Sequence, residues 1–124
     1  MPYNESTEMY LETLYILQQE HGHAHVADVA NRLNITMPSV SKAMNRLREL
    51  KLINKQAYGA ITLTKEGETI SKRINRKHNM IADYLVKSLK LSREDALENA
   101  CKIEHVISDS AMNAIMHFLE SEVG

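Results

Sequence analysis

Three residues near the C-terminus have side chains that could bind a transition metal together. Cys101, Glu104 and His105 stand at positions i, i+3 and i+4, a spacing that places them side by side on one face of a helix. A thiolate, a carboxylate and an imidazole suit a transition-metal ion, whereas calcium and magnesium prefer oxygen ligands alone. The structural alternative is a small buried cysteine beside two polar residues of an amphipathic helix.

Three ligands rarely complete a metal site, so further donors are expected from other predicted helices. The apolar spacing of Thr7–Glu20 predicts a helix that carries Met9 and Glu12 three residues apart on one face. By residue type alone, Met9 is ordinary core filling and Glu12 an ordinary solvated charge. A long helix is predicted from about Lys65 to Leu89, with His78 in its middle.

A second pattern lies in the first half of the chain. A short helix over Val26–Leu33, a turn over 34–36 and a second helix up to Leu50 form a helix-turn-helix. The second helix opens with small polar residues followed by Lys and Arg, which suit contacts to base edges and phosphates. The residues predicted to contact DNA are Thr36, Pro38, Ser39, Ser41, Lys42 and Arg46.

Shorter elements complete the chain. Two strand-like pieces, Ile53–Gln56 and Ala60–Leu63, flank a turn and predict the β-hairpin wing of a winged helix. The triplet Cys101, Glu104 and His105 is expected on one helix, and a last helix is expected over Ala111–Glu122. Many apolar positions of this C-terminal region have no obvious partner nearby, which favours a homodimer.

Composition and charge narrow the class of protein. The 124 residues have a net charge of −1, but residues 42–77 hold ten Lys and Arg against three Glu, whereas residues 78–124 hold four against eight acidic residues. This asymmetry indicates a polyanion partner for the middle of the chain. One cysteine permits no internal disulfide, and the chain has neither a signal-peptide pattern nor a membrane span. We expect a cytoplasmic protein without a membrane partner.

With these pieces placed, the sequence resembles the diphtheria-toxin-repressor family of metal-dependent transcriptional regulators, which includes manganese transport regulators. T-E-M-Y-L-E-T-L-Y is similar to the opening helix of the family, P-S-V-S-K to its recognition helix, and L-T-K-E-G to the turn after its wing. R-K-H and A-C-K-I-E-H-V-I-S-D are similar to two segments of its metal domain. The resemblance covers nearly the whole chain.

The resemblance implies a hybrid set of metal ligands. Glu12 and His78 match ligand positions of the manganese-responsive branch, and His78 also matches an ancillary ligand of the iron-responsive branch. The positions that match the regulatory site of the iron-responsive branch are Met9, Cys101, Glu104 and His105.

Two departures from the iron-responsive branch stand out. Ala82 and Leu97 occupy the places of other ancillary ligands, and the chain stops at Gly124, so we expect that the third, SH3-like domain is absent. The implied fold is mainly α with a small β-hairpin. A winged helix-turn-helix DNA-binding domain over residues 1–72 is followed by an all-helical metal-binding and dimerisation domain over residues 73–124.

The function implied by the resemblance is a repressor that binds operator DNA when a divalent metal is present and controls metal-uptake genes. The soft donors Met9 and Cys101 favour Fe²⁺ as activator, with Mn²⁺ second and with Zn²⁺ or Co²⁺ able to bind in vitro. The alternative is a metal-independent winged-helix regulator that responds to another ligand. A metallohydrolase is disfavoured because the sequence offers no convincing nucleophile, so we expect neither an enzyme nor a small organic substrate.

Overall fold

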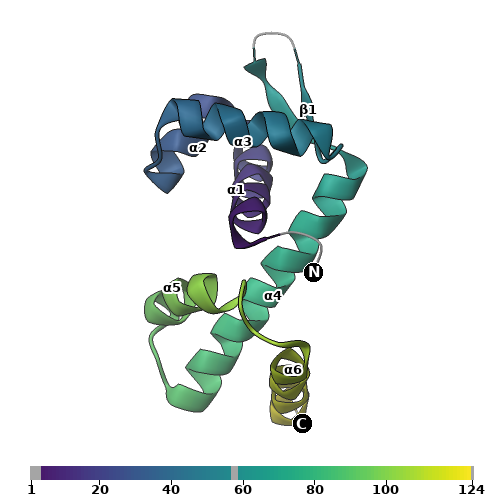
Figure 1. Cartoon of the computed structure of the whole chain (residues 1–124). Helices are drawn as coiled ribbons and strands as arrows, with labels where there is room; N and C mark the ends of the chain where they lie inside the picture. The colour runs from purple at the N-terminus through teal and green to yellow at the C-terminus, as the bar shows by residue number, and fades with distance from the viewer. Residues whose placement is uncertain (1–3, 57–58, 124) are drawn as a thin grey trace. The chain divides into compact units, whose positions relative to one another are not determined.

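The computed structural model describes residues 4–56 and 59–123. The chain divides into two compact units, Met1–Lys72 and Arg73–Gly124. The elements follow in the order α1 Glu5–His21, α2 Val26–Leu33, α3 Met37–Glu49, β1 Ile53–Lys55, β2 Ile61–Leu63, α4 Lys65–Leu89, α5 Arg93–Ile103 and α6 Asp109–Val123 (Figure 1). The fold class predicted from the sequence is therefore confirmed.

The first unit is a helix-turn-helix followed by a two-stranded antiparallel hairpin. The side chain of Asn4 accepts a hydrogen bond from the Thr7 amide and so caps α1, and the C-cap residue Gly22 adopts the left-handed conformation at φ 84°. In the hairpin Ile53 pairs with Leu63, and Ala24 forms a further bridge to Ile61. The predicted turn at residues 57–58 lies outside the described residues.

The core of the first unit is built from one apolar stripe on each helix. On α3 this stripe comprises Val40, Met44 and Leu47, which are spaced at i, i+4 and i+7 and are buried. Buried side chains of α1, α2, β2 and the residue before β1 belong to the same core, namely Leu11, Leu14, Val29, Ile61 and Leu52. Because the apolar face of α3 is used in this way, its opposite face is left to solvent.

Helix α4 is seated against the hairpin through a glycine. Thr64 caps the helix by accepting a hydrogen bond from the Gly67 amide at 3.1 Å. A Cβ atom at Gly67 would lie 2.1 Å from the carbonyl oxygen of Leu52, so only glycine permits this approach. Further along α4, the buried Ser71 hydroxyl donates to the Leu11 carbonyl at 3.2 Å and thereby links α4 to α1.

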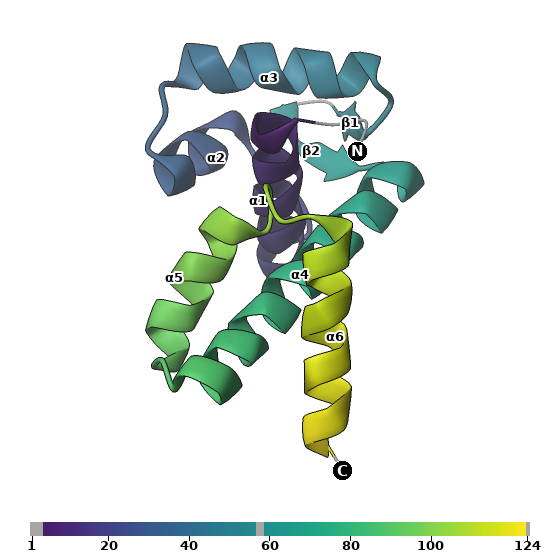
Figure 2. The ribbon, with the colours of Figure 1, turned by 60° about the horizontal axis from the view of Figure 1, so that its bottom comes forward.

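The second unit packs α5 and α6 against the C-terminal part of α4 (Figure 2). Its core is small and aliphatic, with an edge-to-face contact between Tyr84 and Phe118 at a centroid distance of 5.1 Å beside it. The buried core residues are Ile81, Ala82, Leu85, Ala96, Ala100 and Ile115. Among the described residues, every helix is too short or too polar to cross a lipid bilayer.

Candidate metal centre and nucleic-acid interface

A buried carboxylate with two imidazoles beside it lies in the second unit. The Nδ1 atom of His78 is 3.2 Å from Oε2 of Glu104, and the Nε2 atom of His105 is 3.3 Å from Oε1. The Glu104 side chain has no exposed surface, and the side chains of His78 and His105 are 16% and 4% exposed. A carboxylate removed from water to this degree requires a compensating charge or strong hydrogen bonds.

The end of α5 positions this group differently from the sequence expectation. The prediction that Cys101, Glu104 and His105 share one helix is wrong, because α5 ends at Ile103. Glu104 is the C-cap residue, still in the right-handed helical region, and His105 lies in the following turn. The carbonyl of Ile103 accepts from the amides of Val106 and Ile107, both at 3.0 Å, which closes this turn.

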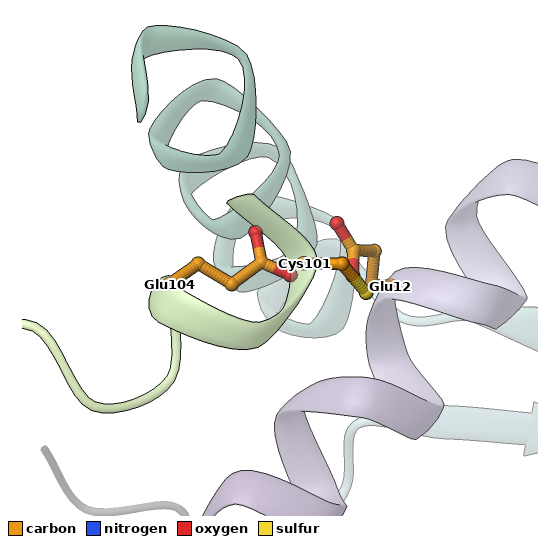
Figure 3. Close-up of side chains that lie close together, drawn as sticks. All are labelled: Glu12, Cys101 and Glu104. Carbon is orange, nitrogen blue, oxygen red and sulfur yellow. The ribbon is translucent and has the colours of Figure 1, made fainter. Parts of the chain in front are cut away.

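Cys101 remains on the last turn of α5, near Glu104. Its sulfur and a carboxylate oxygen of Glu104 lie within 4.8 Å of each other (Figure 3). Cys101 is an exposed residue, so the alternative of a small apolar residue packed in the core does not describe it. A thiol at the surface next to a buried carboxylate is placed to donate its sulfur to an ion.

The two nitrogen–oxygen separations at Glu104 are short enough for the two atoms of each pair to bind one ion. Atoms that bind one ion in a tetrahedron at about 2.1 Å lie about 3.4 Å from one another. The two nitrogen–oxygen distances at Glu104, 3.2 and 3.3 Å, are close to that value. One carboxylate, two imidazoles and one thiol also form the mixed N, O and S set that such metals accept.

The two remaining predicted ligands lie on α1 in the first unit. Met9 and Glu12 are three residues apart, Met9 is half-buried, and the Thr13 hydroxyl donates to the Met9 carbonyl at 2.9 Å. Glu12 is only 7% exposed, so its interpretation as a solvated charge is wrong. Carboxylates are rarely buried in this way unless they are paired or bind a metal.

The exposed face of α3 carries the predicted contacts to DNA. Lys42 and Arg46 are exposed one turn apart, together with Pro38 and Asn45. Ser41 is half-buried, so it is less accessible than the prediction of an outward-facing side chain supposed. Cations on one face of the second helix of a helix-turn-helix suit phosphate contacts.

Two of the residues predicted to contact DNA, Thr36 and Ser39, form hydrogen bonds with each other at the start of α3. The Thr36 hydroxyl accepts from the Ser39 amide at 3.4 Å and donates to the Ser39 hydroxyl at 2.9 Å. Thr36 is thus the N-cap, as predicted, and its hydroxyl is largely occupied by this local role. Both residues are exposed, so their remaining lone pairs face solvent.

A groove of about 580 Å³ runs between the beginning of α1 and the exposed side of α3. Hydroxyl and amide groups line its α1 side, and the α3 side carries Lys42 and Arg46 together with the carboxylate of Glu49. The lining residues that carry these groups are Asn4, Ser6, Thr7, Ser39, Lys42 and Arg46. The first turn of α1 therefore borders the same basic surface as α3.

Three further histidines lie at the end of α1 and in the loop that follows it. The rings of His23 and His25 meet edge to face at 4.9 Å, and His25 is the N-cap of α2. Within residues 4–56 and 59–123, the imidazoles of His21, His23 and His25 do not gather with further donors into a possible metal cluster.

One exposed residue at the start of α3 is not among the residues predicted to contact DNA. Met37 is 51% exposed although it stands three residues before Val40, at the spacing of the buried stripe. Met37 lies in the first turn of the helix, so no earlier turn of α3 covers its side chain. This position in the sequence indicates that the side chain is exposed.

Two family models match the chain. The model described as the iron dependent repressor, N-terminal DNA binding domain, matches residues 3–61. The model described as the iron dependent repressor, metal binding and dimerisation domain, matches residues 64–121. Between them they cover nearly the whole sequence.

Similar curated proteins are transcriptional regulators. An HTH-type transcriptional regulator of Methanocaldococcus jannaschii is 35% identical over 118 residues, with 94% of both chains covered. The HTH-type transcriptional regulator MntR of Geobacillus kaustophilus is 31% identical, and the match covers 94% of this chain and 85% of that protein. The iron-dependent repressor IdeR of Mycobacterium tuberculosis is 30% identical, with 94% of this chain and 51% of that protein covered.

Solved structures show the same fold. IdeR of T. acidophilum superposes with a TM-score of 0.84 at 27% identity and covers 91% of this chain. The manganese regulator SloR superposes with a TM-score of 0.77, also at 27% identity, and covers 97% of this chain. The present chain spans about half the length of these two proteins, 53% and 55% respectively.

Proposed function

Because the chain belongs to the iron-dependent repressor family, we propose that it is a transcriptional repressor that binds operator DNA when a divalent metal is bound. The observation that supports this proposal most strongly is the buried Glu104 carboxylate between His78 and His105, in a chain whose α3 exposes Lys42 and Arg46. Metal-uptake genes are the natural targets of such a protein. The proteins similar to this chain include the iron-dependent repressor IdeR and the manganese regulator SloR.

We assign the two activities to different parts of the chain. Residues 1–72 would bind DNA through α3, and residues 73–124 would bind metal and dimerise. In the second unit Leu89, Val106 and Met116 are exposed apolar side chains. Exposed apolar residues of this kind favour a homodimer through the C-terminal helices, which sedimentation of the metal-free protein at micromolar concentration would test.

The proposed ligands come from both units. A bound divalent ion supplies positive charge that offsets the buried carboxylate of Glu104. His78 and His105 would donate ring nitrogens, and Cys101 would donate its thiolate. Met9 and Glu12 complete the set in this proposal, so that α1 would be held by the same centre as the second unit.

In this proposal, metal binding and DNA binding are coupled through the position of α1. Helix α1 packs on α2 and α3 within the first unit, so its position bears on the position of the recognition helix. Operator half-sites recur at a fixed spacing, and a dimer with both recognition helices fixed at that spacing binds more tightly. Metal and operator would then favour each other by about 1–3 kcal/mol.

We propose Fe²⁺ as the activator in the cell, with Mn²⁺ second. The thiolate of Cys101 and the thioether of Met9 are soft donors that disfavour a hard ion, whereas Glu12 and His78 are compatible with manganese. In vitro, Zn²⁺ and Co²⁺ should bind at least as tightly as Fe²⁺, because affinity follows the general order of the divalent metals.

The test begins with chelator-stripped protein and a pool of random DNA duplexes. Under anaerobic conditions, protein with Fe²⁺ should enrich a two-fold symmetric duplex, whereas stripped protein with chelator should enrich none. Equal enrichment in both samples would indicate a metal-independent regulator and would overturn the proposal. Titration of the selected duplex with Fe²⁺ and Mn²⁺ then ranks the two activators.

A double variant tests the metal preference. Met9→Asp together with Cys101→Glu replaces both soft donors by carboxylates and should shift activation toward Mn²⁺. A matched control is Met80→Asp with Glu98→Gln, which changes a half-buried methionine and an exposed glutamate outside the proposed ligand set. If the wild type responds to Mn²⁺ at lower concentration than to Fe²⁺, the iron assignment is wrong.

A further inference from the structure

The first residue of α3 is a methionine whose side chain is not used by the core. Met37 is 51% exposed, whereas Val40 and Met44, which continue the same stripe, have no exposed surface. Side chains on a helix lean toward its N-terminus, so a side chain in the first turn extends past the end of the helix. Met37 is therefore an apolar group at the leading end of the recognition helix.

The side chains that neighbour Met37 differ in the groups of DNA that they can contact. Thr36 and Ser39 bond to each other as the helix cap, and Lys42 and Arg46 are cations suited to phosphates or guanine. The one apolar group on the major-groove edges of the base pairs is the C5 methyl group of thymine, and the apolar groups exposed at this end of α3 are Met37, Pro38 and the methyl group of Thr36. The apolar thioether side chain of Met37, at the N-terminus of α3, is suited to van der Waals contact with this methyl group.

We propose that Met37 reads a thymine in each operator half-site through contact with its C5 methyl group. This inference rests on the proposed DNA-binding function and adds a specificity-determining residue to it. Because recognition helices of this class enter the major groove with their N-terminal residues nearest the bases, Met37 occupies a position that reaches base edges.

Uracil provides a direct probe, because it differs from thymine only by lacking the methyl group. The probe is the duplex selected by metal-loaded wild type, with each thymine replaced in turn by deoxyuridine. At one symmetric pair of positions, each replacement should weaken wild-type binding by about fourfold, the effect of one buried methyl group. All base-edge hydrogen-bonding groups are unchanged by the replacement.

Variants of Met37 should remove this response. Met37→Ala should bind the thymine duplex about fourfold more weakly per half-site and should not distinguish thymine from uracil at that position. Met37→Gln, which keeps a long side chain but ends in an amide, should also lose the distinction. The matched control is Leu50→Ala, which removes another exposed apolar side chain, 42% exposed, at the opposite end of α3 and should retain the full response.

The outcomes separate this inference from the function on which it rests. If metal-loaded wild type enriches no duplex, the proposed function fails and this inference fails with it. If a duplex is enriched but no uracil replacement weakens binding, the inference alone is overturned. It is equally overturned if Met37→Ala keeps the wild-type response to uracil, because another side chain would then contact the methyl group.

Discussion

The Nδ1 atom of His78, on α4, lies 3.2 Å from the Oε2 atom of Glu104, which caps the end of α5. This contact joins two helices of the second unit through a carboxylate whose side chain is fully buried. On the other side of the same carboxylate, Oε1 is 3.3 Å from His105. Glu104 is thus the central residue of the candidate metal centre.

Glu104→Gln should remove metal binding while leaving a folded protein. Glutamine has nearly the same shape but no charge, so the loss of metal affinity should exceed the roughly 10–100-fold typical of an outer-shell residue. Calorimetric titration with Mn²⁺ or Co²⁺ measures the affinity, and circular dichroism checks the fold. The control is Glu98→Gln on the exposed side of α5. Wild-type affinity in Glu104→Gln would exclude Glu104 as a ligand.

Ser71→Ala should destabilise the first unit by about 0.5–1.5 kcal/mol through loss of one buried hydrogen bond. The Ser71 hydroxyl shares its one proton between the Gly67 carbonyl within α4, at 2.8 Å, and the Leu11 carbonyl on α1, at 3.2 Å. Ser88→Ala is the matched control, because the Ser88 hydroxyl donates only to Tyr84 within α4. Urea unfolding of both metal-free variants isolates the contribution of the bond to α1. Equal destabilisation by Ser71→Ala and Ser88→Ala would show that the contact with Leu11 does not contribute to stability.

Gly67→Ala should reverse the usual sign of a glycine-to-alanine change in a helix. Elsewhere this change stabilises a helix by about 1 kcal/mol. Here the new Cβ atom would lie 2.1 Å from the Leu52 carbonyl oxygen, so a backbone shift should cost about 1–3 kcal/mol. Thermal unfolding measures the change, with exposed Thr69→Ala on the same helix as control. A more stable Gly67→Ala protein would show that the close approach is not maintained.

Lys42→Ala should weaken operator binding and reduce its salt dependence. If Lys42 contacts one phosphate, the slope of log K against log salt concentration should fall by about 0.9. Fluorescence anisotropy at several salt concentrations gives this slope. Lys87→Ala, in the last turn of α4, removes an exposed cation from the second unit and should leave the slope unchanged. An unaltered slope in Lys42→Ala would remove this residue from the interface.

Sequence patterns predicted the elements of the first unit because local rules determine them. The apolar spacing and the residues that flank α2 predicted its limits, Val26–Leu33, as observed. Thr36 and Thr64 cap α3 and α4 because a hydroxyl at the start of a helix accepts a hydrogen bond from a nearby backbone amide. These interactions span three residues, so the sequence contains both partners within one turn.

Features that depend on distant partners could not be predicted in this way. The burial of Glu12 arises from tertiary packing, and no local pattern distinguishes it from a solvated glutamate. The Ser71 hydroxyl meets an acceptor sixty residues away in sequence. Helix α5 ends at Ile103 although neither glycine nor proline occurs between residues 100 and 107, so the turn that carries His105 had no local signal.

The most direct test of the proposed coupling measures metal affinity twice, by titration of the same protein with and without the selected operator duplex. Linkage requires that the operator tighten metal binding by the same factor by which metal tightens operator binding. We predict an increase in metal affinity of about 5–150-fold when saturating operator is present. Identical metal affinities with and without the operator would contradict metal-activated DNA binding.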